Sequence, residues 1–178
     1  MWTQGCSIRC AGCINPHLFS ARGGREISAN ELVASAVSAG VEGLTFLGGE
    51  PFDQSSALGE VAELAHEAGL GVICFTGYTY ESLLETSAGH RRLLAATDLL
   101  VDGPYIESTP EETRSLVGSA NQRFIHLTGR YRDYDPTRNA NRVDVRVGPD
   151  GTVDVAGFLN TDSLKHFIGP IGVRRARR

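Results

Sequence analysis

Three cysteines, Cys6, Cys10 and Cys13, lie within eight residues near the start of the chain. Thiolates this close in sequence share one loop and can converge on one metal centre, but three ligands leave one coordination position open. A structural zinc site would fill that position with a fourth protein ligand, which the nearby His17 could supply. A catalytic 4Fe-4S cluster would instead keep one iron open for a molecule that binds from outside. These two alternatives imply different functions.

A second motif, Gly48-Gly49-Glu50-Pro51, follows the short apolar run 44–47. Paired glycines allow a backbone to approach a ligand closely, and a carboxylate just beyond them can accept hydrogen bonds from an ammonium group. Alone, such a motif is more often an ordinary turn with a solvated acid. It indicates a binding site here because the same chain also contains the cysteine loop. The fourth cysteine, Cys74, lies inside an apolar run and is expected to be a core residue.

The elements that must position these residues alternate between helix and strand. Ser28 and Glu31 form a capping box at the start of a helix that Gly40 ends. Strands are expected at 2–4, 44–47, 71–75, 98–101 and 123–127. Helices are expected from about residue 58 until just before Gly69, and at 80–96 with an interruption at 87–89. Strands separated by helices of this length predict parallel βαβ units with right-handed crossovers.

After residue 127 the pattern changes. A long loop is expected at 131–142, then an antiparallel hairpin with strands at 143–147 and 152–155, and a short helix from Asp162 to Phe167. With 178 residues and 41% hydrophobic side chains, the chain can bury roughly 70% of its unfolded surface. We therefore expect one domain, with residues 1–130 as its core and residues 131–178 packed on it.

Ligands of parallel sheets gather at the carboxyl ends of the strands. The unusual residues of this chain fall at that edge. The loops that follow the expected strands are the cysteine loop, Gly48–Pro51, Thr76-Gly77-Tyr78 and Asp102-Gly103-Pro104-Tyr105. The sequence therefore predicts that four loops face one site.

Composition and charge limit the partners and the cellular location that we expect for this chain. The formal net charge is -4 with a pI near 5.7, which does not indicate a nucleic-acid binder, and the basic tail at 174–178 is expected to be a solvated end. No run approaches the ~20 apolar residues of a membrane span, and no charged leader with an apolar core is present. Clustered cysteines do not resemble a disulfide framework. We expect a cytoplasmic protein with reduced thiols.

The pattern Cys6-x3-Cys10-x2-Cys13 together with Gly48-Gly49-Glu50-Pro51 resembles the radical S-adenosylmethionine (radical SAM) superfamily. Five further motifs are similar to one branch of that superfamily, the activating proteins of anaerobic ribonucleotide reductase. They lie at 2–6, 12–16, 76–81, 101–105 and 118–123. The resemblance extends over most of residues 2–127. Two positions depart from it: Gly12 and Ile14 stand where relatives often carry an aromatic side chain, so adenine would rest against an aliphatic one.

The resemblance implies a fold and a ligand set. The fold would be α/β, a partial, open parallel βα barrel of the radical SAM type with a C-terminal antiparallel hairpin and short helix. Cys6, Cys10 and Cys13 would bind a 4Fe-4S cluster with one open iron. The residues implied for S-adenosylmethionine are Gly12, Gly48, Gly49, Glu50, Pro51, Thr76, Asp102 and Arg123. For Asp102 and Arg123 an ion pair that holds the loops together is an equal alternative.

The implied activity is reductive cleavage of S-adenosylmethionine to a 5'-deoxyadenosyl radical, which installs a glycyl radical on a large partner such as anaerobic ribonucleotide reductase. Electrons would come from flavodoxin or a similar low-potential donor, and no catalytic residue beyond the cluster and cofactor is expected. Neither nucleic acid nor a membrane is expected as a partner. Two alternatives remain: a radical SAM enzyme that modifies a peptide or small molecule directly, and a non-catalytic Cys3His zinc or iron-sulfur protein.

Overall fold

The computed structural model describes residues 1–138 and 143–157. Its strands are β1 (Trp2–Thr3), β2 (Gly43–Gly48), β3 (Gly71–Phe75), β4 (Leu99–Asp102), β5 (Arg123–His126), β6 (Val143–Val147) and β7 (Val153–Gly157). Its helices are α1 (Ala29–Ser38), α2 (Ser55–Glu67), α3 (Tyr80–Glu85) and α4 (Ala88–Ala95), with short 3-10 turns η1 (Pro16–Leu18), η2 (Pro51–Gln54) and η3 (Pro136–Arg138). By its contacts the chain divides into two units, residues 1–110 with 119–134, and residues 111–118 with those from 135 onward.

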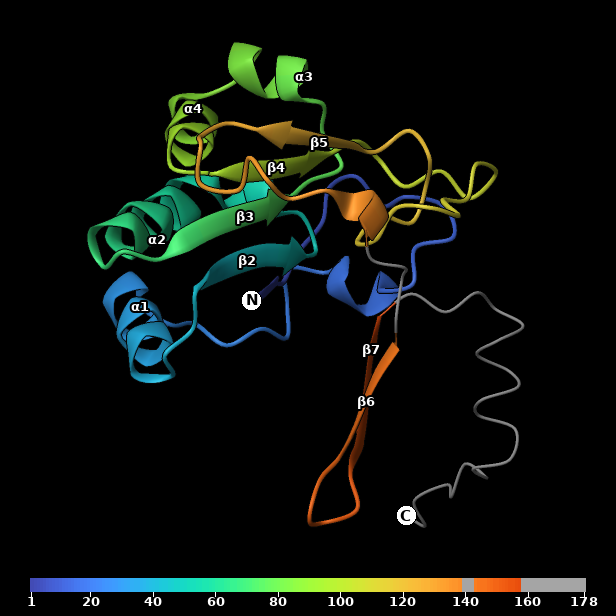
Figure 1. The fold of residues 1–178 in the computed structure, drawn as a ribbon, viewed down its shortest axis with the longest axis horizontal. Coiled ribbons are helices and arrows are strands. Elements are labelled where there is room, and N and C mark those ends of the chain that lie inside the picture. Colours follow the sequence, from blue (N-terminus) through green and yellow to red (C-terminus); the bar gives the residue numbers. More distant parts are fainter. Residues whose placement is uncertain (139–142, 158–178) are drawn as a thin grey trace. The chain divides into compact units, whose positions relative to one another are not determined.

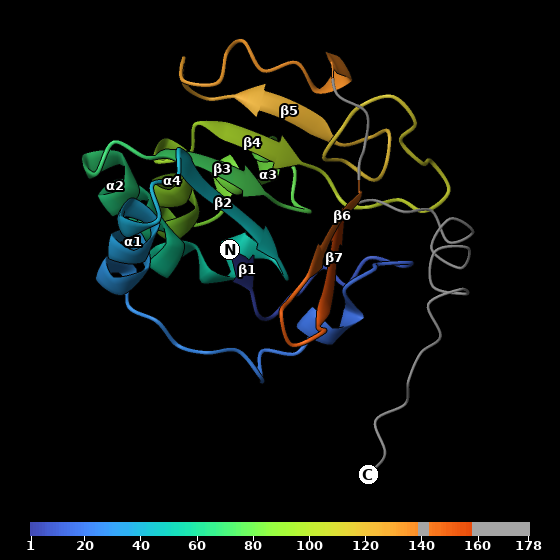
Figure 2. The ribbon, with the colours of Figure 1, turned by 60° about the horizontal axis from the view of Figure 1, so that its bottom comes forward.

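The first unit is built on an open five-stranded sheet in the order β1-β2-β3-β4-β5. The first four strands are parallel, and β5 pairs antiparallel with β4. Because the strand order follows the sequence, right-handed crossovers place successive helices on one face. Figure 1 and Figure 2 show α1, α2 and α4 gathered on the same side of the sheet. The open α/β fold with parallel strands expected from the sequence is confirmed for β1 to β4, whereas the antiparallel direction of β5 was not predicted.

Local signals explain where the helices begin. Ser28 caps α1 by accepting a hydrogen bond from the Glu31 N–H (3.2 Å), as the capping box predicts. The expected helix at 80–96 is two helices, and the side chain of Ser87 caps the second by accepting from the His90 N–H (3.1 Å). Asp98, predicted as a strand residue, directly precedes β4, and its carboxylate accepts a hydrogen bond from the backbone N–H of Val72 (2.8 Å).

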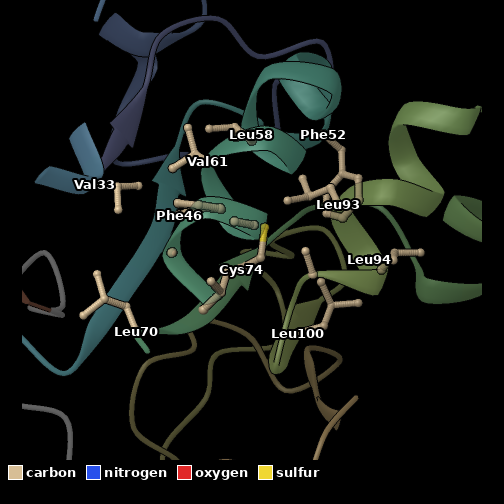
Figure 3. Packing of buried hydrophobic residues seen from close by; sticks show 14 of the residues in the cluster. Val33, Phe46, Phe52, Leu58, Val61, Leu70, Cys74, Leu93, Leu94 and Leu100 are labelled. Carbon is tan, nitrogen blue, oxygen red and sulfur yellow. The ribbon is translucent and has the colours of Figure 1, made fainter. Parts of the chain in front are cut away.

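The core of this unit lies between the helices and the sheet. Phe46 and Cys74 face each other in the register of β2 and β3, and Leu100 is the partner of Cys74 on β4. All three side chains are fully buried, as is Leu93 of α4, and Figure 3 shows them packed together. Burial raises the pKa of the Cys74 thiol well above its usual range. The prediction that Cys74 is a core residue is confirmed.

The described part of the second unit contains the expected hairpin. β6 and β7 pair antiparallel, with Val145 opposite Val155, and the Asp150 side chain accepts from the backbone N–H of Thr152 (3.1 Å) in the turn. The helix expected at 162–167 and the basic tail lie outside the described residues. Every helix in the described ranges is too short or too polar to cross a membrane.

Candidate functional site

The parallel strands end at one edge of the sheet, as their order requires. Figure 1 shows the arrowheads of β2, β3 and β4 at the same side, where the N-terminal loop, drawn in blue, also lies. That loop leaves β1 at Thr3 and carries the three cysteines. The backbone N–H groups of Gly5 and Cys6 donate to the carbonyls of Leu18 (2.9 Å) and Phe19 (3.3 Å), which closes the loop on η1.

The glycine pair brings the end of β2 against the entry to the cysteine loop. The Gly49 N–H donates to the Thr3 carbonyl (2.9 Å), and the Glu50 N–H donates to the Gly5 carbonyl (2.8 Å). A Cβ on Gly49 would lie 2.0 Å from the Gly5 oxygen, and Gly48 has a φ of +114° with Thr3 backbone 2.6 Å from the position of a Cβ. The close approach expected for a ligand is therefore made by the chain's own backbone.

Glu50 is 1% exposed and joins the ends of β2 and β3. One carboxylate oxygen accepts from the Phe52 N–H (2.9 Å) and the Thr76 hydroxyl (2.8 Å), and the other accepts from the Gly77 N–H (2.9 Å). Burial raises the pKa of Glu50 to about 7, although these hydrogen bonds favour the ionised form. The carboxylate and the Thr76 hydroxyl, both expected to meet the cofactor, are thus engaged with each other.

Two further loops hold the cysteine loop. The Ser7 N–H donates to Asp53 (2.7 Å), the Ser7 hydroxyl donates to the same carboxylate (2.8 Å), and that hydroxyl also lies 2.9 Å from the Tyr78 hydroxyl. The Ile8 side chain covers Gly77, where an added Cβ would lie 2.6 Å from its Cδ1 atom. Sequence reasoning missed Asp53, Ser7 and Tyr78, although Asp53 is the second residue after the glycine motif and Tyr78 lies in one of the loops predicted to face the site.

The thiols of Cys6, Cys10 and Cys13 are half-buried and unbridged. Burial raises the pKa of Cys10, and the charges of Cys6 and Cys13 raise it further, so the three sulfurs lie within electrostatic range of one another. The Asn15 N–H donates to the Cys13 sulfur (3.4 Å), and the backbone of Tyr105, in the loop after β4, opposes the rise in the pKa of Cys10. Soft thiolates with backbone donors suit an iron-sulfur cluster.

Among residues 1–138 and 143–157, no three or more Cys, His, Asp or Glu side chains are gathered closely enough to hold a single metal ion. The zinc alternative requires such a set from the three cysteines and His17. A 4Fe-4S cluster places each thiolate on a separate iron, so it does not need this convergence. His17 lies on η1, where its carbonyl accepts from the Gln4 side chain (3.2 Å).

Gly12 lies beneath a carboxylate. It has a φ of +73°, and a Cβ at this position would come 2.8 Å from the Cδ atom of Glu107. A neighbouring hollow of about 450 Å³ is lined by Ala11 of the cysteine loop and by residues 105–108. Ile14, two residues further along the chain, is 68% exposed. Glu107 is a further residue near the cysteines, besides Asp53, Ser7 and Tyr78, that sequence reasoning missed.

Asp102 and Arg123 bind each other. Asp102 is fully buried at the end of β4 and accepts from the Tyr80 N–H (2.7 Å) and from Arg123 Nε (2.9 Å). A second guanidinium nitrogen of Arg123 pairs with both Asp102 and Glu81. The structure thus contains the ion pair that the sequence offered as the alternative to a cofactor role, and this pair joins β4, β5 and the start of α3.

Known proteins are similar to this chain over the residues that build the site. The family described as 4Fe-4S single cluster domain matches residues 1–125. A pyruvate formate-lyase-activating enzyme from Clostridium pasteurianum is 33% identical over 131 residues, 68% of this chain and 50% of the relative. An anaerobic ribonucleoside-triphosphate reductase-activating protein from Vibrio cholerae is 27% identical over 138 residues, 72% of this chain and 86% of the relative. The chain therefore spans half the length of the clostridial relative.

These similarities confirm the resemblance to activating proteins. The matched residues include the three cysteines, the glycine motif and the loops that hold them. Because the match covers well over half of its residues, the chain belongs to the 4Fe-4S single cluster domain family.

Proposed function

We propose that this chain is a radical S-adenosylmethionine enzyme that installs a glycyl radical on a large partner, such as anaerobic ribonucleotide reductase. One observation carries the proposal. A loop with three half-buried thiols is fastened by the loops that follow β2, β3 and β4, so that its position is fixed by the sheet. The similarity to two activating proteins supports the same assignment.

The cysteines would hold a 4Fe-4S cluster through three of its irons. When bound, this cluster supplies a low-potential electron to the sulfonium of S-adenosylmethionine chelated at the fourth iron. The chain itself orients the sulfurs: the Asn15 N–H donates to Cys13 (3.4 Å), and the backbone of Tyr105 lies close enough to Cys10 to favour its thiolate. Such donors stabilise the reduced cluster, because they offset the negative charge that it gains.

The cofactor would lie along the glycine motif. Because the Glu50 carboxylate already accepts three hydrogen bonds, we assign the amino group of the cofactor to main-chain carbonyl groups here. Within the described residues, none donates to the carbonyl of Gly49, which leaves this oxygen available. Of the residues implied by the resemblance, Gly12 and Gly48–Pro51 would contact the cofactor, whereas Thr76, Asp102 and Arg123 would support their loops.

The sheet is open, with five strands in the described part of the first unit. We interpret it as a partial radical SAM barrel whose incomplete side admits a protein substrate. A glycine loop of the partner would enter there, and a flavodoxin or similar low-potential donor would supply the electrons. Together, the two proteins would exclude water and other hydrogen donors from this space, which protects the radical from side reactions.

The experiment is anaerobic reconstitution with iron and sulfide, reduction, and addition of S-adenosylmethionine. Methionine and 5'-deoxyadenosine are expected by chromatography, and Cys10→Ser should abolish both products while Cys74→Ser leaves them. Addition of a candidate glycyl-radical enzyme should then give a glycyl doublet by electron paramagnetic resonance (EPR). Absence of 5'-deoxyadenosine would rule out the proposal. Products without a doublet on any such partner would favour direct modification of a peptide or small molecule.

A further inference from the structure

Asp53 is an anionic residue beside the cysteine loop whose charge has no part in the proposed function. It lies on η2, and both of its carboxylate oxygens bind Ser7, one to the backbone N–H (2.7 Å) and one to the hydroxyl (2.8 Å). The Tyr78 hydroxyl also donates to it (3.3 Å). Ser7 is the residue next to Cys6, so Asp53 fixes the backbone that carries the first thiol.

The charge of Asp53 is not neutralised. Within residues 1–138 and 143–157, no Lys, Arg or His forms an ion pair with it, and its partners are uncharged. After burial, its charge is a further cause of the raised pKa of Glu50. Asp53 is exposed, but its two hydrogen bonds to Ser7 hold this carboxylate against the cysteine loop, beside the residue next to Cys6.

We propose that Asp53 positions Cys6 through Ser7 and lowers the reduction potential of the cluster. This inference rests on the cluster of the proposed function. Two effects act in the same direction. A fixed negative charge close to a cluster opposes the addition of an electron. In addition, Asp53 takes up the Ser7 N–H, and a backbone N–H left free there could donate to a cysteine sulfur and raise the potential.

The test is the midpoint potential of the reconstituted cluster, measured by EPR-monitored redox titration without S-adenosylmethionine. Asp53→Asn keeps the shape and an acceptor oxygen but removes the charge, so its midpoint should be more positive. Asp53→Glu keeps the charge and should lie between the wild type and the asparagine variant. Ser7→Ala keeps both the charge and the backbone donor, and it should shift the midpoint less than Asp53→Asn does.

Asp133→Asn is the matched control. Asp133 is exposed and has no side-chain hydrogen bond or ion pair with any described residue, so this variant makes the same charge change without touching the loop. Its midpoint should equal that of the wild type. Ionic strength distinguishes an electrostatic cause of the midpoint shift from a structural one, because salt screens charges. The Debye length falls from about 30 Å to about 3 Å between about 0.01 M and about 1 M ionic strength. The shift in Asp53→Asn should shrink over this range.

The results distinguish a failure of the role proposed for Asp53 from a failure of the proposed function. A full cluster in Asp53→Asn with the wild-type midpoint overturns the role of Asp53 and leaves the proposed function standing. An equal positive shift in Asp53→Glu and Asp53→Asn, or a shift that salt does not change, overturns the electrostatic effect. A wild-type chain that binds no iron and sulfide overturns both proposals.

Discussion

Replacing Gly49 by alanine tests the contact that joins the glycine motif to the cysteine loop. The new methyl group would lie 2.0 Å from the Gly5 oxygen and 2.7 Å from its carbonyl carbon. Gly49 has no left-handed φ, so the backbone conformation itself suits alanine. The whole penalty therefore comes from the collision with backbone, which has no side chain that could turn away.

The magnitude follows from the two hydrogen bonds at this contact. Opening a 2.0 Å approach to an acceptable separation requires a shift of about 1 Å, which breaks the bonds from Gly49 to Thr3 (2.9 Å) and from Glu50 to Gly5 (2.8 Å). Each such bond contributes about 1 kcal/mol, and overpacking adds about 1–3 kcal/mol. The expected loss is about 3–5 kcal/mol, a large part of the ~5–15 kcal/mol of a typical domain.

The assay has two readouts. Urea unfolding followed by circular dichroism should give the loss in free energy of unfolding, and anaerobic reconstitution should give less bound iron, because the cysteine loop has lost its anchor. Gly129→Ala is the control, since Gly129 has nothing within 4 Å of an added Cβ and no left-handed φ. It should be neutral or stabilising by up to about 1 kcal/mol. Wild-type stability and iron content in Gly49→Ala would refute this reasoning.

Three further predictions test the packing around the site. Because the pKa of Glu50 rises from 4.5 to about 7, the folded chain binds more protons in that interval, and its stability should fall by about 3 kcal/mol as pH rises through it. Urea unfolding of Glu50→Gln at several pH values should lack this slope. Cys74→Ala should lose about 1–2 kcal/mol of stability while iron content stays unchanged. Arg123→Met leaves the buried Asp102 unpaired and should cost about 1–3 kcal/mol by urea unfolding, against about zero for the exposed Arg91→Met.

The sequence was sufficient for features that depend on local spacing. The cysteine loop could be found because three thiols within eight residues need no tertiary contact to share a loop. The order of the strands gave the shared edge, since consecutive βαβ units repeat one handedness. Cys74 was predictable as core because it lies in an apolar run flanked by glycine and threonine.

Contacts between distant residues could not be predicted in this way. The partner of the glycine pair is the backbone of Thr3 and Gly5, and this depends on the register of the two-residue strand β1 against β2. Asp53 meets Ser7 across 46 residues of chain. The ion pair of Arg123 with Asp102 could be offered only as an alternative, because it depends on β5 running antiparallel to β4. No periodicity or motif specifies these pairings, because each is set by tertiary geometry.

The most direct test of the central claim is Mössbauer spectroscopy of the chain reconstituted anaerobically with 57Fe, before and after addition of S-adenosylmethionine. The cluster held by Cys6, Cys10 and Cys13 should show four irons per chain, of which one changes its spectrum when S-adenosylmethionine is added. A chain that binds a single tetrahedral zinc through these cysteines and His17, or a cluster in which no iron responds, would contradict the account.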